Sequence, residues 1–527
     1  MEKILPPPSE LIPGILLSSS RALRRRGKKT YREAVPENSS YPSFLVSVRK
    51  TFKHSMYILF KFEETVPDYP FPFGSLVQVF GPEGDKEAER AYFLARNNLK
   101  LKDWRQPLKF KEEILKYAAE DPFSSERINL EALKVFSIDP EGCLDIDDAL
   151  HFKETSIGWE VGIHIADVAS YLPVGSSLDL WAREKGVSLY FPKSLGLPFL
   201  PMLPLLEEKA SLLPGKRRRA FSLILSFSSS FKLLETNFVH TSIRNRKAWS
   251  YEEAEAALDK NSELLALKTF STSYFDPPPV STHTLIALWM KEANKLCASR
   301  LLATSSPGIF RIQKDKGIPL PETSSFYSSL IYHLQTGRAK YGTKEESSLK
   351  HTGLKISAYT HFTSPLRRFA DLTVHRILSS VLPEESNLSI LCEHLNQKQK
   401  EAKQAERSAL LLEFLLLYKE VFPLQTEGRV VGIEETHILL FLPAFSFLLP
   451  CPLFSKAMFE FIERISSKTS VSFIRKDKPE NKLKLSLEQE VSLQIVFSAS
   501  EGSFSSRLRV QLLDPDPLAL LISSEIE

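Results

Sequence analysis

Cysteine is scarce in this sequence of 527 residues, and the placement of the few cysteines excludes two classes of protein. They stand far apart, with no CxxC pair and no histidine at a spacing that zinc would use. The four positions are Cys143, Cys297, Cys392 and Cys451. Neither a disulfide framework nor a zinc module is therefore expected. A reducing compartment fits this pattern, and we predict a cytoplasmic protein.

Long hydrophobic runs are absent as well. No stretch reaches the roughly 18 apolar residues that a membrane-spanning helix needs. The N-terminal "MEKILPPPSELIPG" interrupts its apolar segment with prolines, which argues against a secretory signal. The Ser- and Arg-rich "SSSRALRRRGKK" that follows leaves an organelle transit peptide as the alternative to a cytoplasmic location. We expect no membrane partner.

The chain also has no large excess of charge, since its formal net charge is +4. Its basic residues gather locally instead, within residues 21–29 and in "KRRR" at 216–219. Such runs are usually solvated faces, but together with "SPLRRF" they favour a phosphate-bearing partner. With 43% hydrophobic residues, the chain can bury a large core, and its length predicts roughly two to four domains.

The first part of the chain predicts a small β-domain followed by helix. The segments "PSFLVSV", "SMYILFKF" and "GSLVQVF" alternate or run apolar between turn residues, which favours a barrel of the OB or cold-shock kind within residues 1–85. The segment "LKFKEEILKYAAED" carries apolar residues at helical spacing. We therefore predict a helical connector over residues 86–133.

The remainder predicts a mixed α+β core and a second β-domain. Strand-like runs such as "WEVGIHIADV" and "RAFSLILSFS" give way to helical patterns, of which "LNQKQKEAKQAERSALLLEFLLLYKE" is the clearest. These patterns predict a catalytic domain over residues 134–420. The tail returns to short strands, and residues 421–527 are predicted to form a five-stranded OB barrel, a module that grips single-stranded nucleic acid.

The stretch "SIDPEGCLDIDDAL" packs four carboxylates into ten positions. An EF-hand calcium loop counted from Asp139 fails, because Leu144 stands where glycine is needed and Leu150 where glutamate is needed. Two interpretations remain open: loop aspartates that cap a helix, or a partly buried magnesium site in which two ions about 4 Å apart assist phosphodiester hydrolysis. The apolar residues on both sides favour burial. The four acids are Asp139, Asp145, Asp147 and Asp148.

These residues, with "GIHIADVASYLPVGSSLDLWAREKGVSLYFP", "LPMLP" and "SAYTHFTSPLRRFADLTVHRIL", resemble the RNB family of exoribonucleases, of the RNase II and RNase R type. The resemblance extends in order over about residues 75 to 515. It implies an α+β RNB core with OB barrels at both ends. It also implies a monomeric, hydrolytic 3′-to-5′ exoribonuclease that degrades single-stranded RNA to nucleoside 5′-monophosphates with two Mg²⁺ ions, for which Mn²⁺ could substitute.

The resemblance assigns roles to residues. It makes Asp139, Asp145, Asp147 and Asp148 the metal ligands. It makes Asp147 and Arg367 the catalytic pair, with Arg367 on the scissile phosphate. The RNA-binding set is Tyr190, Arg367, Arg368 and Glu406. We expect Asp167, Arg368 and Asp371 to pair behind the site, whereas His164 and His361, in apolar surroundings, are left out of the catalytic set.

The sequence departs from the family pattern at several points. There is room for one clear N-terminal barrel, with residues 10–35 as a degenerate remnant of a second. Phe270 and Phe275 are the candidates for a second base-stacking aromatic, and Gln313 replaces a histidine. The C-terminal barrel has no obvious row of surface aromatics, so its RNA contacts are expected from Arg429, Lys456 and Arg475. A catalytically weak RNA-binding protein and a narrow-substrate trimming nuclease or endonuclease therefore remain alternatives.

Overall fold

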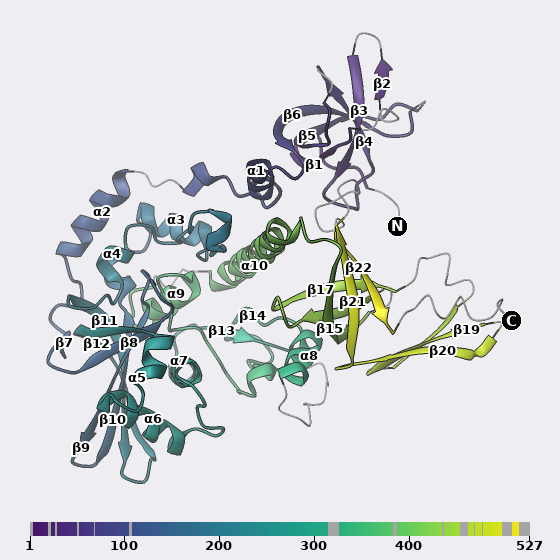
Figure 1. Cartoon of the computed structure of the whole chain (residues 1–527). Coiled ribbons are helices and arrows are strands. Elements are labelled where there is room, and N and C mark those ends of the chain that lie inside the picture. The colour runs from purple at the N-terminus through teal and green to yellow at the C-terminus, as the bar shows by residue number, and fades with distance from the viewer. Residues whose placement is uncertain are drawn as a thin grey trace.

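The structure of the chain is a computed structural model, in which a small N-terminal β-domain, a large α+β core and a C-terminal β-region surround the long helix α10 (Figure 1). It describes residues 4–18, 23–26, 29–49, 52–67, 69–104, 108–314, 326–382, 387–434, 437–453, 462–467, 469–476, 478–497 and 508–515. The predicted α+β class is confirmed. The predicted domain limits stay a proposal.

The N-terminal domain is a single barrel. Its strands are β1 (Ile12–Leu16), β2 (Leu23–Arg26), β3 (Lys29–Pro36), β4 (Phe44–Val48), β5 (Met56–Glu64) and β6 (Phe73–Pro82). Strand β1 pairs antiparallel with both β3 and β5, which closes the sheet around Phe44, Ile58 and Phe60. Strands β1, β2 and β3 pair within this one sheet, so the expectation that residues 10–35 are a remnant of a second domain is wrong. Their strands pair with the others through backbone hydrogen bonds.

The connector is helical, as the sequence predicts. It contains α1 (Lys86–Arg96), the short 3₁₀ helix η2 (Leu101–Trp104) and α2 (Leu108–Ala119). Helix α1 begins after Asp85, whose side chain accepts the Ala88 N–H, and this cap satisfies a donor that the first helical turn leaves free. Tyr92 of α1 stacks on Tyr57 of the barrel at 4.2 Å, so the helix is fixed to the N-terminal domain.

The core is built on a sheet in the order β11-β10-β9-β8-β12-β7, in which β11 also pairs with β12 and so closes the sheet on itself. The strands are β7 (Ile128–Asn129), β8 (Val135–Asp139), β9 (Asp148–Thr155), β10 (Gly158–Ala166), β11 (Arg217–Ser228) and β12 (Leu233–Ser250). Val161, Ile163 and Ile165 alternate along β10 and are fully buried. Strand β12 runs parallel to β8, so both end on the same side.

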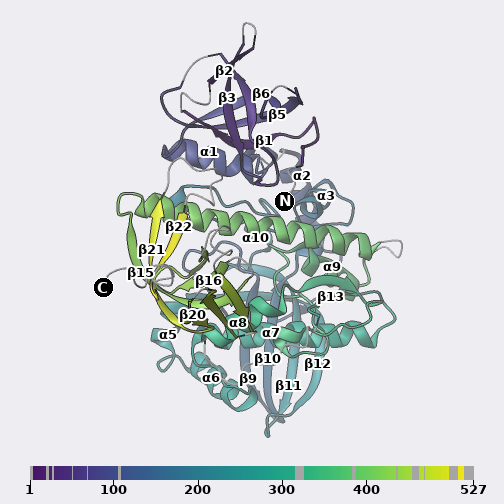
Figure 2. The ribbon, with the colours of Figure 1, turned by 90° about the vertical axis from the view of Figure 1, so that its right-hand side faces the viewer.

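Helices pack against this sheet and around it, and one of them, α8, contacts the C-terminal strands instead. They are α3 (Ser177–Lys185), α4 (Glu207–Ala210), α5 (Tyr251–Ala257), α6 (Ser262–Tyr274), α7 (Thr282–Ala303), α8 (Phe326–Thr336), α9 (Phe369–Leu378) and α10 (Leu388–Tyr418), with 3₁₀ turns η3 (Val168–Tyr171), η4 (Lys193–Leu195) and η5 (Thr352–Leu354). Figure 2 shows α10 lying lengthwise beneath the N-terminal barrel. The hairpin β13 (Ile309–Ile312) and β14 (Lys340–Thr343) pairs beside α10. None of the described helices is both long and apolar enough to cross a membrane.

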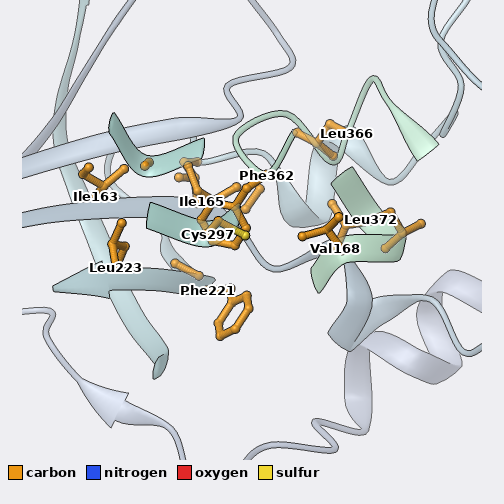
Figure 3. Close-up of a cluster of buried hydrophobic side chains, with 14 of the residues drawn as sticks. Ile163, Ile165, Val168, Phe221, Leu223, Cys297, Phe362, Leu366 and Leu372 are labelled. Carbon is orange, nitrogen blue, oxygen red and sulfur yellow. The ribbon is translucent and has the colours of Figure 1, made fainter. Parts of the chain in front are cut away.

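The apolar core reaches the segment that precedes α9. Figure 3 shows Leu366 beside Phe362 and Val168 in a cluster that Ile163 and Phe221 of the sheet continue. Leu366 is only 2% exposed, and its burial fixes the backbone on which the next residue, Arg367, stands. A packed apolar side chain therefore sets the position of a charged one.

The C-terminal strands form two sheets. Five of them, β15 (Leu424–Ile433), β16 (His437–Leu442), β17 (Phe447–Pro452), β21 (Glu490–Phe497) and β22 (Leu508–Asp514), pair in the order β17-β16-β15-β21-β22. The edge strands β17 and β22 approach each other, so this sheet is a curled half-barrel. Strands β18 (Ile462–Ser466), β19 (Ser470–Arg475) and β20 (Lys478–Ser486) form a separate sheet. The strand-rich tail is confirmed, but it is not one closed five-stranded barrel.

Candidate active site

The four aspartates lie on the loop that joins β8 to β9. Asp139 ends β8 and Asp148 begins β9. Backbone hydrogen bonds hold the loop between them, from Leu212 N–H to the Ile146 carbonyl at 3.0 Å and from Ala166 N–H to the Asp147 carbonyl at 2.8 Å. The strand pairing therefore gathers the acids at one end of the sheet, where each interacts electrostatically with at least one of the others.

Asp147 is joined to the segment before α9. Its Oδ1 accepts the Leu366 N–H at 2.9 Å, and its Oδ2 accepts Arg367 Nε at 3.1 Å. The side chain is 3% exposed, and this burial raises its pKa to about 7, although the Arg367 charge opposes the rise. Both carboxylate oxygens are thus occupied by donors of this chain.

Asp139 and Asp148 have fewer partners. Burial, together with the Asp145 charge, raises the pKa of Asp139 to about 6, and its Oδ2 is buried without a hydrogen bond. Burial and the charges of Asp139 and Asp147 raise the pKa of Asp148 well above its usual value. Like charges held together in this way favour a bound cation, and carboxylate oxygens suit the hard ion Mg²⁺.

The remaining aspartate, Asp145, is turned toward Tyr190. The Tyr190 hydroxyl donates to Asp145 Oδ2, and Cys143 Sγ lies 3.4 Å from Oδ1. Within the part of the chain that the structure describes, no three acidic, histidine or cysteine side chains are arranged to hold one metal ion. Asp139 and Asp148 therefore fit a divalent cation best, whereas Asp145 and Asp147 would have to share their present donors with it.

Arg367 stands at the edge of the acidic cluster. Its Nη2 donates to Ser364 Oγ at 2.9 Å, and 44% of its side chain is exposed. Burial opposes its charge, but the Asp147 carboxylate raises the pKa of Arg367 further above its usual value. Arg368, the next residue, is the N-cap of α9. The Arg367 guanidinium therefore carries a fixed charge and has an exposed part that can contact an anion.

Of the three residues expected to pair behind the site, two do so. Arg368 Nη2 lies 2.7 Å from Asp371 Oδ1, which also accepts the Ser364 N–H at 2.8 Å. Asp167 does not join them, because it pairs with Arg127 and His240, each at 2.9 Å. Burial disfavours the Asp167 charge, but hydrogen bonds from His240 and Arg127 lower its pKa to about 2.

Tyr190 and Glu406 reach the site from two other elements. The backbone of Ser188 donates to the Arg367 carbonyl at 3.1 Å, which brings the following Tyr190 beside the acids. The Tyr190 ring is 42% exposed and stacks on Phe199 at 4.8 Å. Glu406 of α10 accepts the backbone N–H of Tyr190, and burial raises the pKa of Glu406. Both expected RNA-binding residues therefore adjoin the cluster.

The two histidines set aside are in structural surroundings. His164 is fully buried and contacts His151 at 2.8 Å and Ser222 at 2.7 Å. His361 contacts the Tyr341 hydroxyl at 2.8 Å. Burial lowers the pKa of His164 and of His361 well below the usual value, so both are neutral.

Tyr251 was missed by sequence reasoning. It begins α5 directly after Ser250, which pairs with Asp139 because β12 and β8 run parallel. Burial and the nearby charges of Asp148 and Asp139 raise the pKa of Tyr251 to about 12. Only the pairing of two strands about a hundred residues apart brings it here, and no local motif marks it.

Several other expected contacts take a different form. Phe270 is 3% exposed and packs against Phe227 in the core, so it cannot stack on a base, and Phe275 packs against Trp289 at 4.9 Å. Gln313, in the place of the family's histidine, is buried and donates to the Gly337 carbonyl at 2.6 Å, which ties two loops together.

The basic run at 216–219 is structural. Arg217 pairs with Glu131 at 3.1 Å, Arg218 is 8% exposed, and Arg219 lies over the Tyr171 ring at 4.4 Å. These contacts hold β11 against its neighbours. The run therefore gives little support to a phosphate-bearing partner.

An aromatic cluster joins helix α8, which precedes α10 in the chain, to strand β16 of the C-terminal region. Phe326 and Tyr327 of α8 lie 5.3 and 6.0 Å from Phe441 of β16, and Phe326 is 62% exposed. Arg429 lies over the Tyr327 ring at 4.7 Å and pairs with Glu490 at 2.5 Å. Of the other expected contacts, Lys456 and the side chain of Arg475 lie outside the described residues.

The chain has a mixed α+β core with an acidic cluster at one end of its sheet, and comparison with known proteins identifies the domain that this core forms. A domain model described as "RNB domain" matches residues 127–273 and 276–384. The chain is 28% identical over 468 residues to "Exosome complex exonuclease RRP44 homolog A" of Arabidopsis thaliana, which covers 71% of this chain and 49% of that protein. RRP44 of Mus musculus is 25% identical to this chain, and the alignment covers 71% of this chain and 48% of RRP44. The chain thus spans about half the length of these curated relatives.

Solved structures agree with this fold. Mycoplasma genitalium RNase R in complex with ribose-methylated single-stranded RNA aligns over 95% of this chain and 89% of its own, with a TM-score of 0.75 and 19% identity. Yeast Ssd1, described as a pseudonuclease, aligns over 97% of this chain and 84% of its own chain, with a TM-score of 0.68 and 17% identity. The chain therefore carries an RNB domain and is related to RRP44 proteins, with the fold of RNase R.

Proposed function

We propose that this protein is a magnesium-dependent, hydrolytic 3′-to-5′ exoribonuclease that releases nucleoside 5′-monophosphates from single-stranded RNA. The observation that carries the proposal is the junction of Arg367 with Asp139, Asp147 and Asp148 at one end of the core sheet. A partly exposed cation beside several buried carboxylates is suited to a phosphodiester and its counter-ion. The free cysteines of the described chain support a reducing, cytoplasmic location as part of this proposal.

Each residue has a role that follows from its position. Mg²⁺ bound at Asp139 and Asp148 would neutralise charge and make a water more acidic. Arg367, kept charged by Asp147 and aimed by Ser364, would hold the scissile phosphate and stabilise the charge that develops on it. The exposed face of Tyr190 would stack on the terminal base, and Glu406 orients Tyr190 through its backbone.

The Asp147 contacts suggest how the arginine is made ready. Asp147 accepts hydrogen bonds from the Leu366 backbone and from the Arg367 side chain, so it holds both the guanidinium and the backbone just before the arginine. A donor held in place before substrate arrives loses little free energy on binding. We therefore assign Asp147 to positioning Arg367 as well as to the expected metal set.

A second function is favoured by one observation. Yeast Ssd1 has the same fold and is described as a pseudonuclease. In this chain two of the four aspartates are engaged by Tyr190 and Arg367. A protein that binds RNA without cutting it is therefore the alternative, and a narrow-substrate trimming nuclease is the variant of the first proposal.

The test is the digestion of a 5′-labelled single-stranded RNA with Mg²⁺ or with EDTA, followed on a sequencing gel. Progressive shortening from the 3′ end that requires Mg²⁺ and is lost in Asp148→Asn supports the exonuclease. RNA that is bound and left intact under every condition supports the alternative. A circular RNA of the same sequence serves as the control, since a strict exonuclease cannot begin on it.

A further inference from the structure

A second cavity lies away from the acidic cluster, where the end of the connector helix α2 meets η3 and the last turn of α9. Its volume is about 470 Å³, within the range of about 300–1,000 Å³ that is typical of ligand pockets. Helices α2 and α3 lie on the side of the core away from the C-terminal strands (Figure 1). Its apolar lining includes Pro122, Phe123, Leu172, Pro173, Val174 and Val381.

The floor of this cavity is buried and held in place. Leu172 is 1% exposed, and its carbonyl accepts Arg376 Nη2 at 2.8 Å. The Phe123 ring stacks on His240 with 3.7 Å between the ring centroids. A ligand therefore meets a preformed surface and loses little free energy in ordering it.

The rim of the cavity is apolar and open to solvent. Val174, just before α3, and Val381, just after α9, are each 40% exposed. Pro173, the neighbour of Val174, is exposed as well. Exposed apolar side chains that gather around a concave site are typical of a surface that a partner covers.

One charge in the lining has no counter-charge. Arg376 Nη2 lies 2.7 Å from Asp179 Oδ1. Asp121 pairs with Arg127 at 2.7 Å. Glu120 is exposed and has no ion pair with any of the described residues, and none of the described lysines lines the cavity. This unpaired carboxylate favours a cationic group and disfavours a phosphate.

A hydrogen-bond donor of the lining is also unused. The Arg376 side chain is 2% exposed, and its Nε has no hydrogen-bond partner within the part of the chain that the structure describes. A buried N–H without an acceptor costs free energy. Because Arg376 belongs to the lining, a neutral carbonyl oxygen in the cavity is a suitable acceptor, and a peptide backbone supplies one at every residue.

We propose that this cavity is a docking site for a segment of a partner protein in which a large apolar side chain stands next to an arginine or lysine. The apolar side chain fills the space between Phe123 and the rim valines, and the basic residue pairs with Glu120. Tryptophan and arginine are the side chains that most often dominate such contacts. The inference is independent of the proposed nuclease activity.

A bound segment leaves the acidic cluster free. Arg368 is the N-cap of α9, and Arg376 follows eight residues later along the chain. At the rise of an α-helix this separates the two by about 12 Å. Partner docking and RNA binding therefore use opposite ends of α9.

The experiment measures the binding of a fluorescein-labelled peptide, Gly-Ser-Trp-Arg-Ser-Gly, by fluorescence anisotropy. We expect saturable binding with a Kd below about 1 mM. Replacing the tryptophan of the peptide by alanine should weaken binding at least about tenfold. Replacing its arginine by glutamate should weaken binding to the wild type by about twofold to fivefold, the size of an exposed ion pair.

Two variants test the two halves of the site. Val174→Ser/Val381→Ser removes the apolar rim and should weaken binding about tenfold. Glu120→Gln should remove the preference for the arginine peptide over the glutamate peptide. The matched controls are Ile157→Ser and Glu154→Gln, at exposed residues beside the β9–β10 turn, and both should bind as the wild type does. Thermal unfolding followed by circular dichroism establishes that each variant is folded.

Several results would overturn the inference. One is the absence of saturable binding up to about 1 mM, and another is equal binding of the peptide without tryptophan. An unchanged affinity in the valine variant would place the peptide elsewhere. Displacement of the peptide by tryptamine at equal concentration would assign the cavity to a small amine. A labelled RNA of about 5 nucleotides that binds in EDTA and loses affinity in the valine variant would assign it to a base.

Discussion

The backbone N–H of Leu366 donates to Oδ1 of Asp147 at 2.9 Å, although the two residues are 219 positions apart. Leu366 is buried in the apolar core, so this bond ties the aspartate loop to a rigid point. Arg367 follows directly and contacts the other oxygen of the same carboxylate. The core thus fixes the distance between the acids and the arginine.

Asp148→Asn should remove cleavage and keep RNA binding. The amide has the same shape but no charge, so it cannot hold a cation with Asp139. We expect kcat to fall by at least about 100-fold and the Kd for RNA to change less than about threefold. Rates on labelled RNA and fluorescence anisotropy provide the two measurements, with Asp259→Asn on the exposed surface as the control. Equal losses in rate and affinity would show that Asp148 binds RNA and not metal.

Arg367→Lys should slow cleavage by about 100-fold. Lysine keeps the positive charge but loses the fork that contacts Asp147 and Ser364 together, so the charge is no longer fixed. The effect should fall on kcat more than on KM, because the substrate still meets a cation. Steady-state kinetics on a single RNA measure the split, and a change confined to KM would contradict the role in the transition state.

Magnesium should stabilise the protein against unfolding. At a concentration about 100 times Kd, a bound ion adds about 2.7 kcal/mol to the free energy of unfolding. Asp139→Asn/Asp148→Asn should remove this effect. Without metal the same double variant should be more stable than the wild type, because it relieves repulsion between two buried carboxylates. Thermal unfolding of the wild type and the double variant, each with and without Mg²⁺, measures both effects. An unchanged magnesium response in the variant would place the ion elsewhere.

Stability should fall as the pH drops below about 6.5, partly because of His375. Burial lowers the folded-state pKa of His375 to about 4, although its hydrogen bond to the Phe362 carbonyl opposes the shift. The unfolded chain takes up a proton near pH 6.5 that the folded chain refuses until about pH 4, so stability is lost between these values. The loss from this residue is roughly 2 to 3 kcal/mol at about pH 4.5. Urea denaturation of wild type and His375→Gln at about pH 7.5 and about pH 4.5 should show the smaller drop in the variant; equal drops would mean that His375 does not titrate.

The aromatic cluster of α8 and β16 should contribute to RNA affinity. Phe326 is 62% exposed beside Phe441, and a base can stack on such a ring. Phe326→Ala should weaken binding of a long single-stranded RNA by about tenfold, within the 1–3 kcal/mol that stacking supplies per base. Leu234→Ala, at an exposed apolar residue of β12, is the control. Equal affinities for Phe326→Ala and the wild type would leave the cluster with a packing role alone.

Local patterns predicted much of this architecture. The helix expected within residues 108–121 is α2, and the long helix that ends before Pro423 is α10. Strands were placed well in the N-terminal barrel and the tail because alternation is a property of neighbouring residues. The barrel's use of residues 12–36 was not foreseen, since it depends on β1 pairing with β5 across more than forty positions.

The sequence by itself determined the chemistry available to this protein. The clustering of four aspartates suggested an acidic site, and the resemblance carried by motifs such as "SPLRR" pointed to Arg367, because side-chain type and local order are properties of the chain. Only the tertiary structure decided what each group contacts. In the folded protein, Asp147 pairs with Arg367, and Asp167 pairs with Arg127 and His240. Tyr251 lies close to Asp139 and Asp148. Such pairings depend on strand register and core packing over long separations, which a short motif does not encode.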